Sequence, residues 1–289
     1  MRKDNHLKPI NPSKNSPIGI LGALPEETEP FLEELEGDRS QQEGRFRFHR
    51  GCYKGQEAVV VCSGTGKVNA VVASQLLIDR FGVKSLLMSG IGGSLYPDAR
   101  PGDAIIGTEL IHHDVGFLYG KEEFISCGVR VLPLPEETDS SPHRVPVFHS
   151  DEGWVTAAHQ AGEELRETGF AVHSGPIVTG ECVVFSSEKK QWLRETFGAL
   201  AVEMEGAAVA QTAYLNGLPF LVVRAVSDSS DERAVKGRET VEKLARAVHP
   251  GKVVQDDSVL RERLSLAARN ASLLVKKTIE QYGLPQEAF

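Results

Sequence analysis

The stretch Phe220-Leu-Val-Val-Arg-Ala-Val-Ser-Asp228 decides the fold. Residues from Phe220 to Val226 are apolar or carry an aliphatic stem, which predicts a strand buried on both faces of a sheet. Further runs rich in Val, Ile and Leu recur at residues 18–21, 58–62, 85–89 and 104–107. Because segments with helical apolar spacing separate these runs, we expect an α/β protein whose sheet is covered by helices.

Helices are predicted between and after these strands. One spans 67–81, and its apolar face is expected to consist of Val68, Val71, Val72, Leu76 and Leu77. An Ala-rich helix is expected over 203–215, because Asn216 and Gly217 are suited to end it. The last predicted helix spans about 259–282.

Charge and composition limit the possible partners. The 289 residues include 32 Lys and Arg against 40 Asp and Glu, which gives a formal net charge of −8. The basic residues are scattered, so the chain lacks the basic surface that nucleic-acid binding requires, and a small-molecule ligand is favoured. The four cysteines show no Cys-x-x-Cys spacing. We therefore expect them to be reduced packing residues, with no metal and no other cofactor.

The chain is expected to form one domain. Residues 1–17 are polar and predict a tail, and one domain follows from 18 to 289. Residues 118–150 hold many charges and prolines and predict a long loop or insertion within that domain. No stretch approaches the roughly 18 apolar residues of a membrane span, so we expect a cytoplasmic protein without a membrane partner.

Acidic residues follow several predicted strands, where ligands of open α/β sheets bind. They are Glu26 and Glu27, the Glu203-Met204-Glu205 triplet, and Asp228. Partial desolvation would raise the pKa of Asp228 enough for it to donate a proton, and a helix N-cap is the alternative. The two acids of the triplet cannot share a helical face, so one is expected to reach the site while the other anchors the helix. A solvated pair at a helix start is the alternative for the triplet.

Two other groups of residues carry weaker signals. The glycine turns 64–66 and 90–93 match neither the Rossmann fingerprint nor the Walker P-loop, so nucleoside triphosphate chemistry is not expected. His112, His113 and Asp114 are adjacent, and consecutive side chains of a strand point to opposite faces. A structural or pocket-edge role is therefore favoured over metal ligation.

Several segments, in order between residues 18 and 232, carry a resemblance to a known family. They are Ile18-Gly-Ile-Leu-Gly-Ala-Leu-Pro-Glu-Glu27, Gly64-Thr-Gly-Lys-Val68, Gly90 to Gly93 with Gly102-Asp103, Ala201-Val-Glu-Met-Glu-Gly-Ala-Ala208 and Val223-Arg-Ala-Val-Ser-Asp228. This pattern resembles the nucleoside phosphorylase superfamily, and within it the methylthioadenosine/S-adenosylhomocysteine nucleosidases. The resemblance implies a single-domain, three-layer α/β/α fold with a central twisted mixed sheet.

The resemblance also implies hydrolysis of the N-glycosidic bond of a 5′-modified adenosine, with release of adenine. Such cleavage passes through an oxocarbenium-like sugar, so the enzyme protonates the departing purine and delivers water to the opposite face. By similarity, Asp228, positioned by Ser227, protonates the purine, and Glu27 aligns and deprotonates the water. Glu205 holds the ribose hydroxyl groups, and Met204 packs on the sugar.

The same similarity completes the predicted substrate-binding residues. Backbone groups near Val183 and Val184 are expected to read the base edge, and the glycine loop contributes Ile91 and Gly92. Glu26 stays an alternative to Glu27 for the water. Phosphorylases of the superfamily hold phosphate with arginines and a Ser or Thr in the glycine loop, where this chain has Ile91. Hydrolysis is therefore favoured over phosphorolysis.

Two other functions stay open beside the nucleosidase. One is a phosphate-dependent nucleoside phosphorylase. The other is a non-catalytic nucleoside-binding or storage relative, against which the joint presence of Glu27, Glu205 and Asp228 argues.

The insertion at 118–150 bears on the substrate and on assembly. It follows the His-Asp motif, near where the family builds its 5′ pocket, so the 5′ group stays open between methylthio and others such as that of futalosine. We expect a homodimer, because the apolar residues of this region need a surface to cover them: Phe117, Leu118, Tyr119 and Phe124.

Overall fold

The computed structural model describes residues 16–119, 123–132, 142–227 and 258–282. Its main sheet has ten strands. They are β1 (Ile18–Gly22), β2 (Glu36–Glu43), β3 (Phe46–Tyr53), β4 (Gln56–Cys62), β5 (Ser85–Ser94), β6 (Ala104–His112), β11 (Phe148–His149), β12 (Val172–Thr179), β13 (Ala201–Glu203) and β14 (Phe220–Val226).

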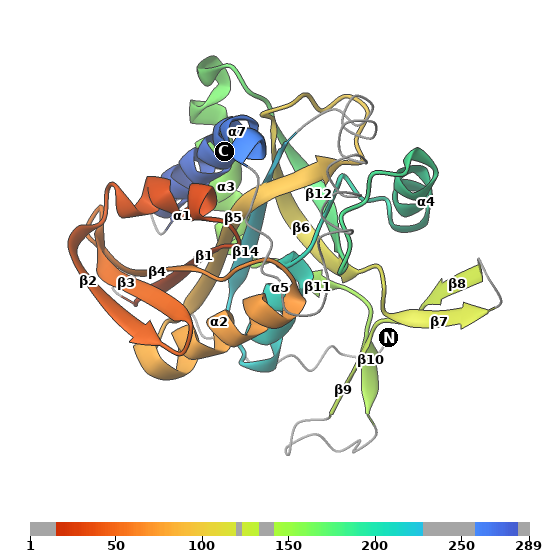
Figure 1. Ribbon diagram of the computed structural model, residues 1–289, viewed down its shortest axis with the longest axis horizontal. Helices are drawn as coiled ribbons and strands as arrows, with labels where there is room; N and C mark the ends of the chain where they lie inside the picture. Colours follow the sequence, from red (N-terminus) through yellow and green to blue (C-terminus); the bar gives the residue numbers. More distant parts are fainter. Residues whose placement is uncertain (1–15, 120–122, 133–141, 228–257, 283–289) are drawn as a thin grey trace.

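The helices are α1 (Pro25–Leu32), α2 (Lys67–Phe81), α3 (Glu152–Glu164), the 3₁₀ helix η1 (Arg166–Thr168), α4 (Ser187–Phe197), α5 (Gly206–Leu215) and α7 (Ser258–Gln281). Four short strands stand apart from the main sheet: β7 (Gly116–Tyr119), β8 (Glu123–Ser126), β9 (Val129–Val131) and β10 (His143–Val145). They form two antiparallel hairpins that project from the body of the molecule (Figure 1).

Part of the main sheet closes into a ring. Strand β5 pairs with β14, β14 with β6, β6 with β12, β12 with β13, and β13 returns to β5. The ring contains both parallel and antiparallel strand pairs, so the predicted mixed sheet is confirmed. The closure brings the end of β5 against the end of β13, with Gly93 opposite Val202.

Helices cover both faces of the sheet because successive strand residues point to opposite sides. On β14, Phe220 and Val222 pack in the layer that contains α2 and α5. Leu221 and Val223 pack in the layer that contains α1, α3 and α7. Figure 1 shows these two groups of helices on opposite sides of the strands, and the predicted three-layer α/β/α arrangement is confirmed.

The apolar face predicted for α2 is right for Leu76 and Leu77, which pack in the core, and wrong for the three valines. Val68 is 73% exposed, and Val71 and Val72 are also exposed, whereas the buried side of the helix contains Ala70, Ala73, Ser74, Leu77 and Phe81. The small alanines share one helical face and let the helix approach the sheet closely, which places the valines on the other face.

Other boundaries also differ from the predictions. Helix α5 begins at Gly206, because residues 201–203 form β13. The segment 118–150 is not a plain loop, since its described parts contain strands. The predicted last helix is confirmed as α7. The division into a tail at 1–17 and one domain stays a prediction, because residues 1–15 lie outside the described part of the chain.

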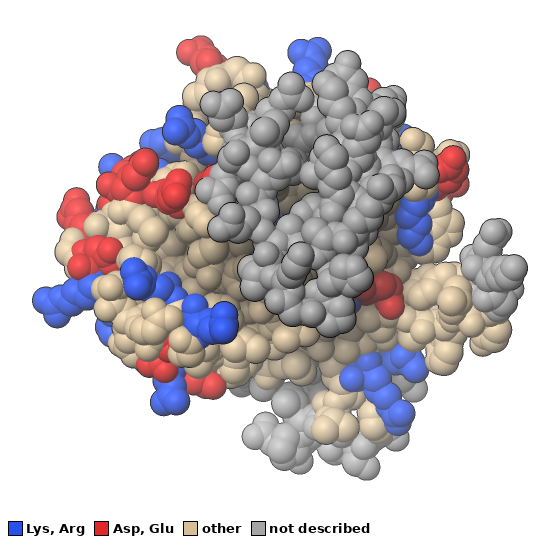
Figure 2. Space-filling view, in the orientation of Figure 1, with Lys and Arg blue, Asp and Glu red and all other residues tan. Residues whose placement is uncertain are grey.

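The cysteines match the expectation from the sequence only in part, and the surface carries charges of both signs. On the face in Figure 2, basic and acidic side chains are both spread around the surface. Cys182 is exposed, so it is not the packing residue that was expected, while the other three cysteines are half-buried free thiols. None of the helices within the described ranges has the length and apolarity needed to cross a membrane. Within those ranges, no three His, Cys, Asp or Glu side chains converge as metal ligands.

Candidate active site

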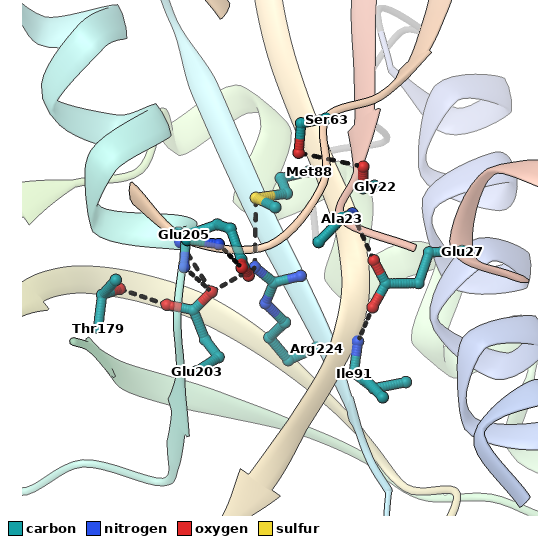
Figure 3. Close-up of polar contacts among 12 residues, drawn as sticks. Gly22, Ala23, Glu27, Ser63, Met88, Ile91, Thr179, Glu203, Glu205 and Arg224 are labelled. Carbon is teal, nitrogen blue, oxygen red and sulfur yellow. Dashed lines mark hydrogen bonds and ion pairs between the residues drawn. The ribbon is translucent and has the colours of Figure 1, made fainter. Parts of the chain in front are cut away.

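Glu27 is a buried carboxylate in the first turn of α1, just beyond the carboxyl end of β1. One of its oxygens accepts the backbone N–H groups of Ala23 at 2.5 Å and Leu24 at 3.0 Å. The other oxygen accepts the N–H of Ile91 on β5 at 2.9 Å (Figure 3). Burial raises the pKa of Glu27 against the opposing charge of Arg224. Glu27 is therefore held in one position and suited to take up a proton.

Arg224 is the cation of the site, and no role was predicted for it from the sequence. Its side chain is fully buried, pairs with Glu203 and lies 3.4 Å from a Glu205 oxygen. Its Nε and Nη1 have no hydrogen-bond partner among the described residues. A Cβ on Gly90 would lie 1.9 Å from Nη1 and 2.8 Å from Oε1 of Glu27, so glycine leaves room for both groups. A single cation inside an otherwise apolar strand was the signal that could have identified Arg224.

Glu203 anchors the start of α5. One oxygen accepts the N–H groups of Glu205 at 2.9 Å and Gly206 at 2.7 Å, and the other accepts the hydroxyl of Thr179. Burial opposes ionisation, but the Arg224 charge and these hydrogen bonds hold the pKa of Glu203 below its ordinary value. Of the two acids in the triplet, Glu203 is thus the one that holds the helix.

Glu205 is the other acid, and it links the triplet to the glycine turn before α2. Its Oε1 accepts the N–H of Gly66 at 2.7 Å, while Oε2 lies 3.4 Å from Nη2 of Arg224. Burial and the adjacent charge of Glu203 raise the pKa of Glu205 to about 7. A carboxylate placed in this way is suited to accept hydrogen bonds from the hydroxyl groups of a ligand.

Of three further predicted site residues, the structure describes Met204 and Ser227 but not Asp228. Ser227 lies at the end of β14, where its N–H donates to the carbonyl of Gly92 at 3.1 Å. Met204 is half-buried between the two acids of the triplet. Asp228, the predicted general acid, lies outside the described residues.

The segment predicted to read the base follows strand β12. Strand β12 ends at Thr179, and Val183 is 63% exposed. Val184 is half-buried and packs against a small apolar cluster that includes Leu193 of α4. The predicted contact of Val183 and Val184 with a base stays a prediction.

The two adjacent histidines are buried at the end of β6. His112 pairs through Nε2 with Gln211 at 3.1 Å, and burial lowers the pKa of both His112 and His113. Nδ1 of His112 and Nε2 of His113 are buried without a hydrogen-bond partner among the described residues, and the structural or pocket-edge role of the pair stays a prediction.

Three buried carboxylates therefore surround one buried guanidinium, so the cluster is acidic as a whole. This arrangement can accept a proton at Glu27 and hydroxyl groups at Glu205. It repels an anion that carries two negative charges, such as phosphate, because one cation is already shared by three acids.

Known proteins with similar sequences fall in one family. A sequence model of the phosphorylase superfamily matches residues 17–276. The chain is 33% identical over 218 residues to a 5′-methylthioadenosine/S-adenosylhomocysteine nucleosidase of Exiguobacterium sp., with 75% of this chain and 87% of the relative covered. It is 35% identical over 234 residues to an aminodeoxyfutalosine nucleosidase of Helicobacter pylori, with 80% and 93% covered.

Solved structures give the same result. The crystal structure of a 5′-methylthioadenosine/S-adenosylhomocysteine nucleosidase from Neisseria meningitidis, in complex with methylthio-immucillin-A, has a TM-score of 0.71 and 31% identity. The match covers 92% of this chain and 99% of that one. With the fold, the order of the motifs and the family match in agreement, this chain belongs to the phosphorylase superfamily.

Proposed function

We propose that this chain is a purine nucleosidase that hydrolyses the N-glycosidic bond of a 5′-modified adenosine, of the methylthioadenosine/S-adenosylhomocysteine type, and releases adenine. The observation that carries the proposal is the placement of Glu27 and Nη1 of Arg224 on the same side of Gly90. Nη1 has no partner among the described residues, and Glu205 lies next to the same guanidinium. An acceptor, a donor and a second acceptor thus meet in one buried place.

This placement suits the delivery of water to a sugar. A water molecule that donates to Glu27 and accepts from Nη1 of Arg224 is oriented by both groups, and the raised pKa of Glu27 favours proton uptake from it. Glu27 suits this role better than Glu26, because Glu27 contacts β5 and faces the guanidinium. Glu205 holds the ribose hydroxyl groups, and Asp228 protonates the purine on the basis of the sequence resemblance.

Hydrolysis fits the site better than phosphorolysis. Arg224 is a cation, but Glu203 and Glu205 contact it and Glu27 is a third acid that faces it. Ile91 presents its backbone N–H to Glu27 and contributes no hydroxyl to hold phosphate. A neutral water molecule is therefore a better nucleophile for this cluster than a phosphate dianion.

The identity of the 5′ substituent is a second part of the proposal. Methylthioadenosine and S-adenosylhomocysteine are the first candidates. The 35% identity to an aminodeoxyfutalosine nucleosidase makes aminodeoxyfutalosine the second candidate for the same reaction.

Adenine release with and without phosphate tests this function. Each of the three candidate nucleosides is incubated with the enzyme in phosphate-free buffer and in excess phosphate, and adenine and sugar products are measured. We expect equal release of adenine in both buffers. A strict need for phosphate, with a sugar 1-phosphate as product, would identify a phosphorylase. Nucleoside binding without any release of base would identify a non-catalytic relative.

We also propose that the enzyme is a homodimer. The exposed valines of α2 and the exposed side chains of the β7–β8 hairpin form apolar surfaces that a second copy can cover: Val68, Val71, Val72, Phe117, Leu118, Tyr119 and Ile125. Residues between Asp114 and Ser150 are proposed to approach the pocket of the second copy. The cytoplasmic location expected from the sequence stays a prediction.

A further inference from the structure

Three charged residues outside the proposed chemistry connect three segments that border the site. The ammonium group of Lys67, at the start of α2, contacts both carboxylate oxygens of Asp114 at 2.8 and 2.9 Å. Asp114 follows β6 and accepts the backbone N–H of Glu181 at 3.1 Å. Glu181 follows β12 and accepts the backbone N–H of Lys67 at 2.9 Å. The contacts therefore form a closed circuit that returns to Lys67.

This circuit lies directly beside the amide that holds Glu205. Lys67 N–H donates to Glu181, and the preceding N–H, that of Gly66, donates to Glu205 at 2.7 Å. A Cβ on Gly66 would lie 3.0 Å from the second oxygen of Glu181, so the Glu181 carboxylate lies against the turn. The N-terminus of α2 thus holds two carboxylates with consecutive amides, one in the site and one in the circuit.

We propose that Lys67, Asp114 and Glu181 are positioning residues that fix the Gly66 amide on Glu205 and so set the affinity of the site for the ribose hydroxyl groups. The inference rests on the proposed function for the identity of the ligand. Isolated ion pairs on a surface contribute little, but a closed circuit restrains all three segments at once. The side chains of Lys67 and Asp114 are 19% and 31% exposed, and Glu181 is exposed.

The first test detects whether the Gly66 amide still donates to Glu205. The titration of Glu205 is followed by ¹³C NMR, with its signal assigned from Glu205→Gln. The groups that face Glu205 are Glu203 on β13, Arg224 on β14, Glu27 on α1 and the Gly66 amide, and that amide lowers the pKa of Glu205. In Glu181→Ala the N–H of Lys67 loses its acceptor. By the proposal, the adjacent Gly66 amide is then no longer held on Glu205, so we expect the titration midpoint of Glu205 to move to higher pH.

Glu181→Gln is the matched control, because it loses the charge but keeps an oxygen that accepts the Lys67 N–H. In this variant we expect the titration midpoint of Glu205 to equal that of the wild type. Lys67→Met opens the circuit at another point and is expected to shift the midpoint in the same direction as Glu181→Ala. A midpoint in Glu181→Ala equal to that of the wild type would overturn the inference.

The second test uses the hydroxyl groups of the substrate. For methylthioadenosine we expect Glu181→Ala to raise KM roughly tenfold with kcat within about twofold, as for the loss of one charge-assisted hydrogen bond. Binding of the 2′,3′-dideoxy counterpart, measured by calorimetry, should not change. An equal loss for both nucleosides would show a general structural role and contradict the proposal.

A control variant and the wild-type enzyme separate a failure of this inference from a failure of the proposed function. Glu163→Ala removes an exposed ion pair with Arg166 and should alter neither the Glu205 titration nor KM. A wild-type enzyme that releases no adenine from any candidate nucleoside would refute the proposed function, while the Glu205 titration would still decide the positioning role.

Discussion

Asp228 and Glu27 divide the proposed reaction between an acid and a base. Asp228→Asn can still hydrogen-bond the purine but cannot protonate it, so kcat should fall by roughly 10² to 10⁴ while nucleoside affinity is kept. Glu27→Gln should behave in the same way, because its amide cannot take a proton from water. Steady-state kinetics and calorimetry on each variant measure the two effects. Wild-type kcat in Asp228→Asn, together with a loss in Glu26→Gln, would show that both assignments are wrong.

Glu205 makes the stability of the protein depend on pH. Its pKa rises from 4.5 in the unfolded chain to about 7 in the folded protein, so the folded state favours the protonated form. The stabilising contribution of Glu205 is therefore complete below pH 4.5 and is lost as the pH rises through about 7. Glu205→Gln, which stays neutral, should gain free energy of unfolding relative to the wild type at pH 8, on the order of 2 to 3 kcal/mol.

Thermal or urea unfolding at pH 4.5 and pH 8 measures this difference. The same variant should bind nucleoside more weakly, by about 1.5 to 3 kcal/mol, because a charge-assisted hydrogen bond to the sugar is lost. A variant that is less stable than the wild type at pH 8 would argue that Glu205 is ionised and well compensated in the folded protein.

Strand β5 depends on one glycine for its part in the site. In Gly90→Ala the added methyl group would overlap Nη1 of Arg224 and press on Glu27, so both side chains must move. We expect at least a hundredfold loss of kcat/KM and a loss of about 1 to 3 kcal/mol in the free energy of unfolding.

Gly93→Ala is the control on the same strand. Its Cβ would meet Val202 at 3.4 Å, which is an ordinary contact, so the losses should be far smaller. Equal activities of the two variants would show that the guanidinium does not need the space beside Gly90.

The elements differ in how well the sequence predicts them. Strand β14 was predicted correctly because a continuous apolar run has one physical solution, burial on both faces. The end of α5 was also predicted, since Asn216 caps it and Gly217 follows with a positive φ of 65°. The face of α2 was predicted only in part, because its buried side combines Leu77 with the small residues Ala70 and Ala73, which a scan for large apolar residues overlooks.

The candidate site was predicted in part for a related reason. Glu27 and Glu205 stand next to strands, so a rule about strand ends found them. Arg224 lies within a strand, and its position becomes meaningful only when the ring of strands places two acids against it. Contacts between residues so distant in sequence are set by the tertiary fold, which local patterns do not record.

Self-association is a property of the whole molecule. Light scattering should give twice the mass of the chain at micromolar concentration, because the apolar side chains of α2 and β7 are costly to leave in water. Leu118→Glu places a charge on the β7–β8 hairpin and should shift the protein toward the monomer. Leu266→Glu, on α7 in the other helical layer, exchanges an equally exposed leucine and should leave the mass unchanged. A wild-type monomer at these concentrations would contradict the dimer.

The ring of strands also constrains how the protein is made. Strand β14 completes the ring by pairing with β5 and β6, which leave the ribosome long before it. Until Val226 has been synthesised, those two strands present unpaired backbone groups that can recruit strands from other nascent chains. A chain that stalls before Phe220 is thus a seed for aggregation and not a smaller enzyme. Since Arg224 arrives on the strand that closes the ring, the acids of the site acquire their counter-ion only as the ring is closed.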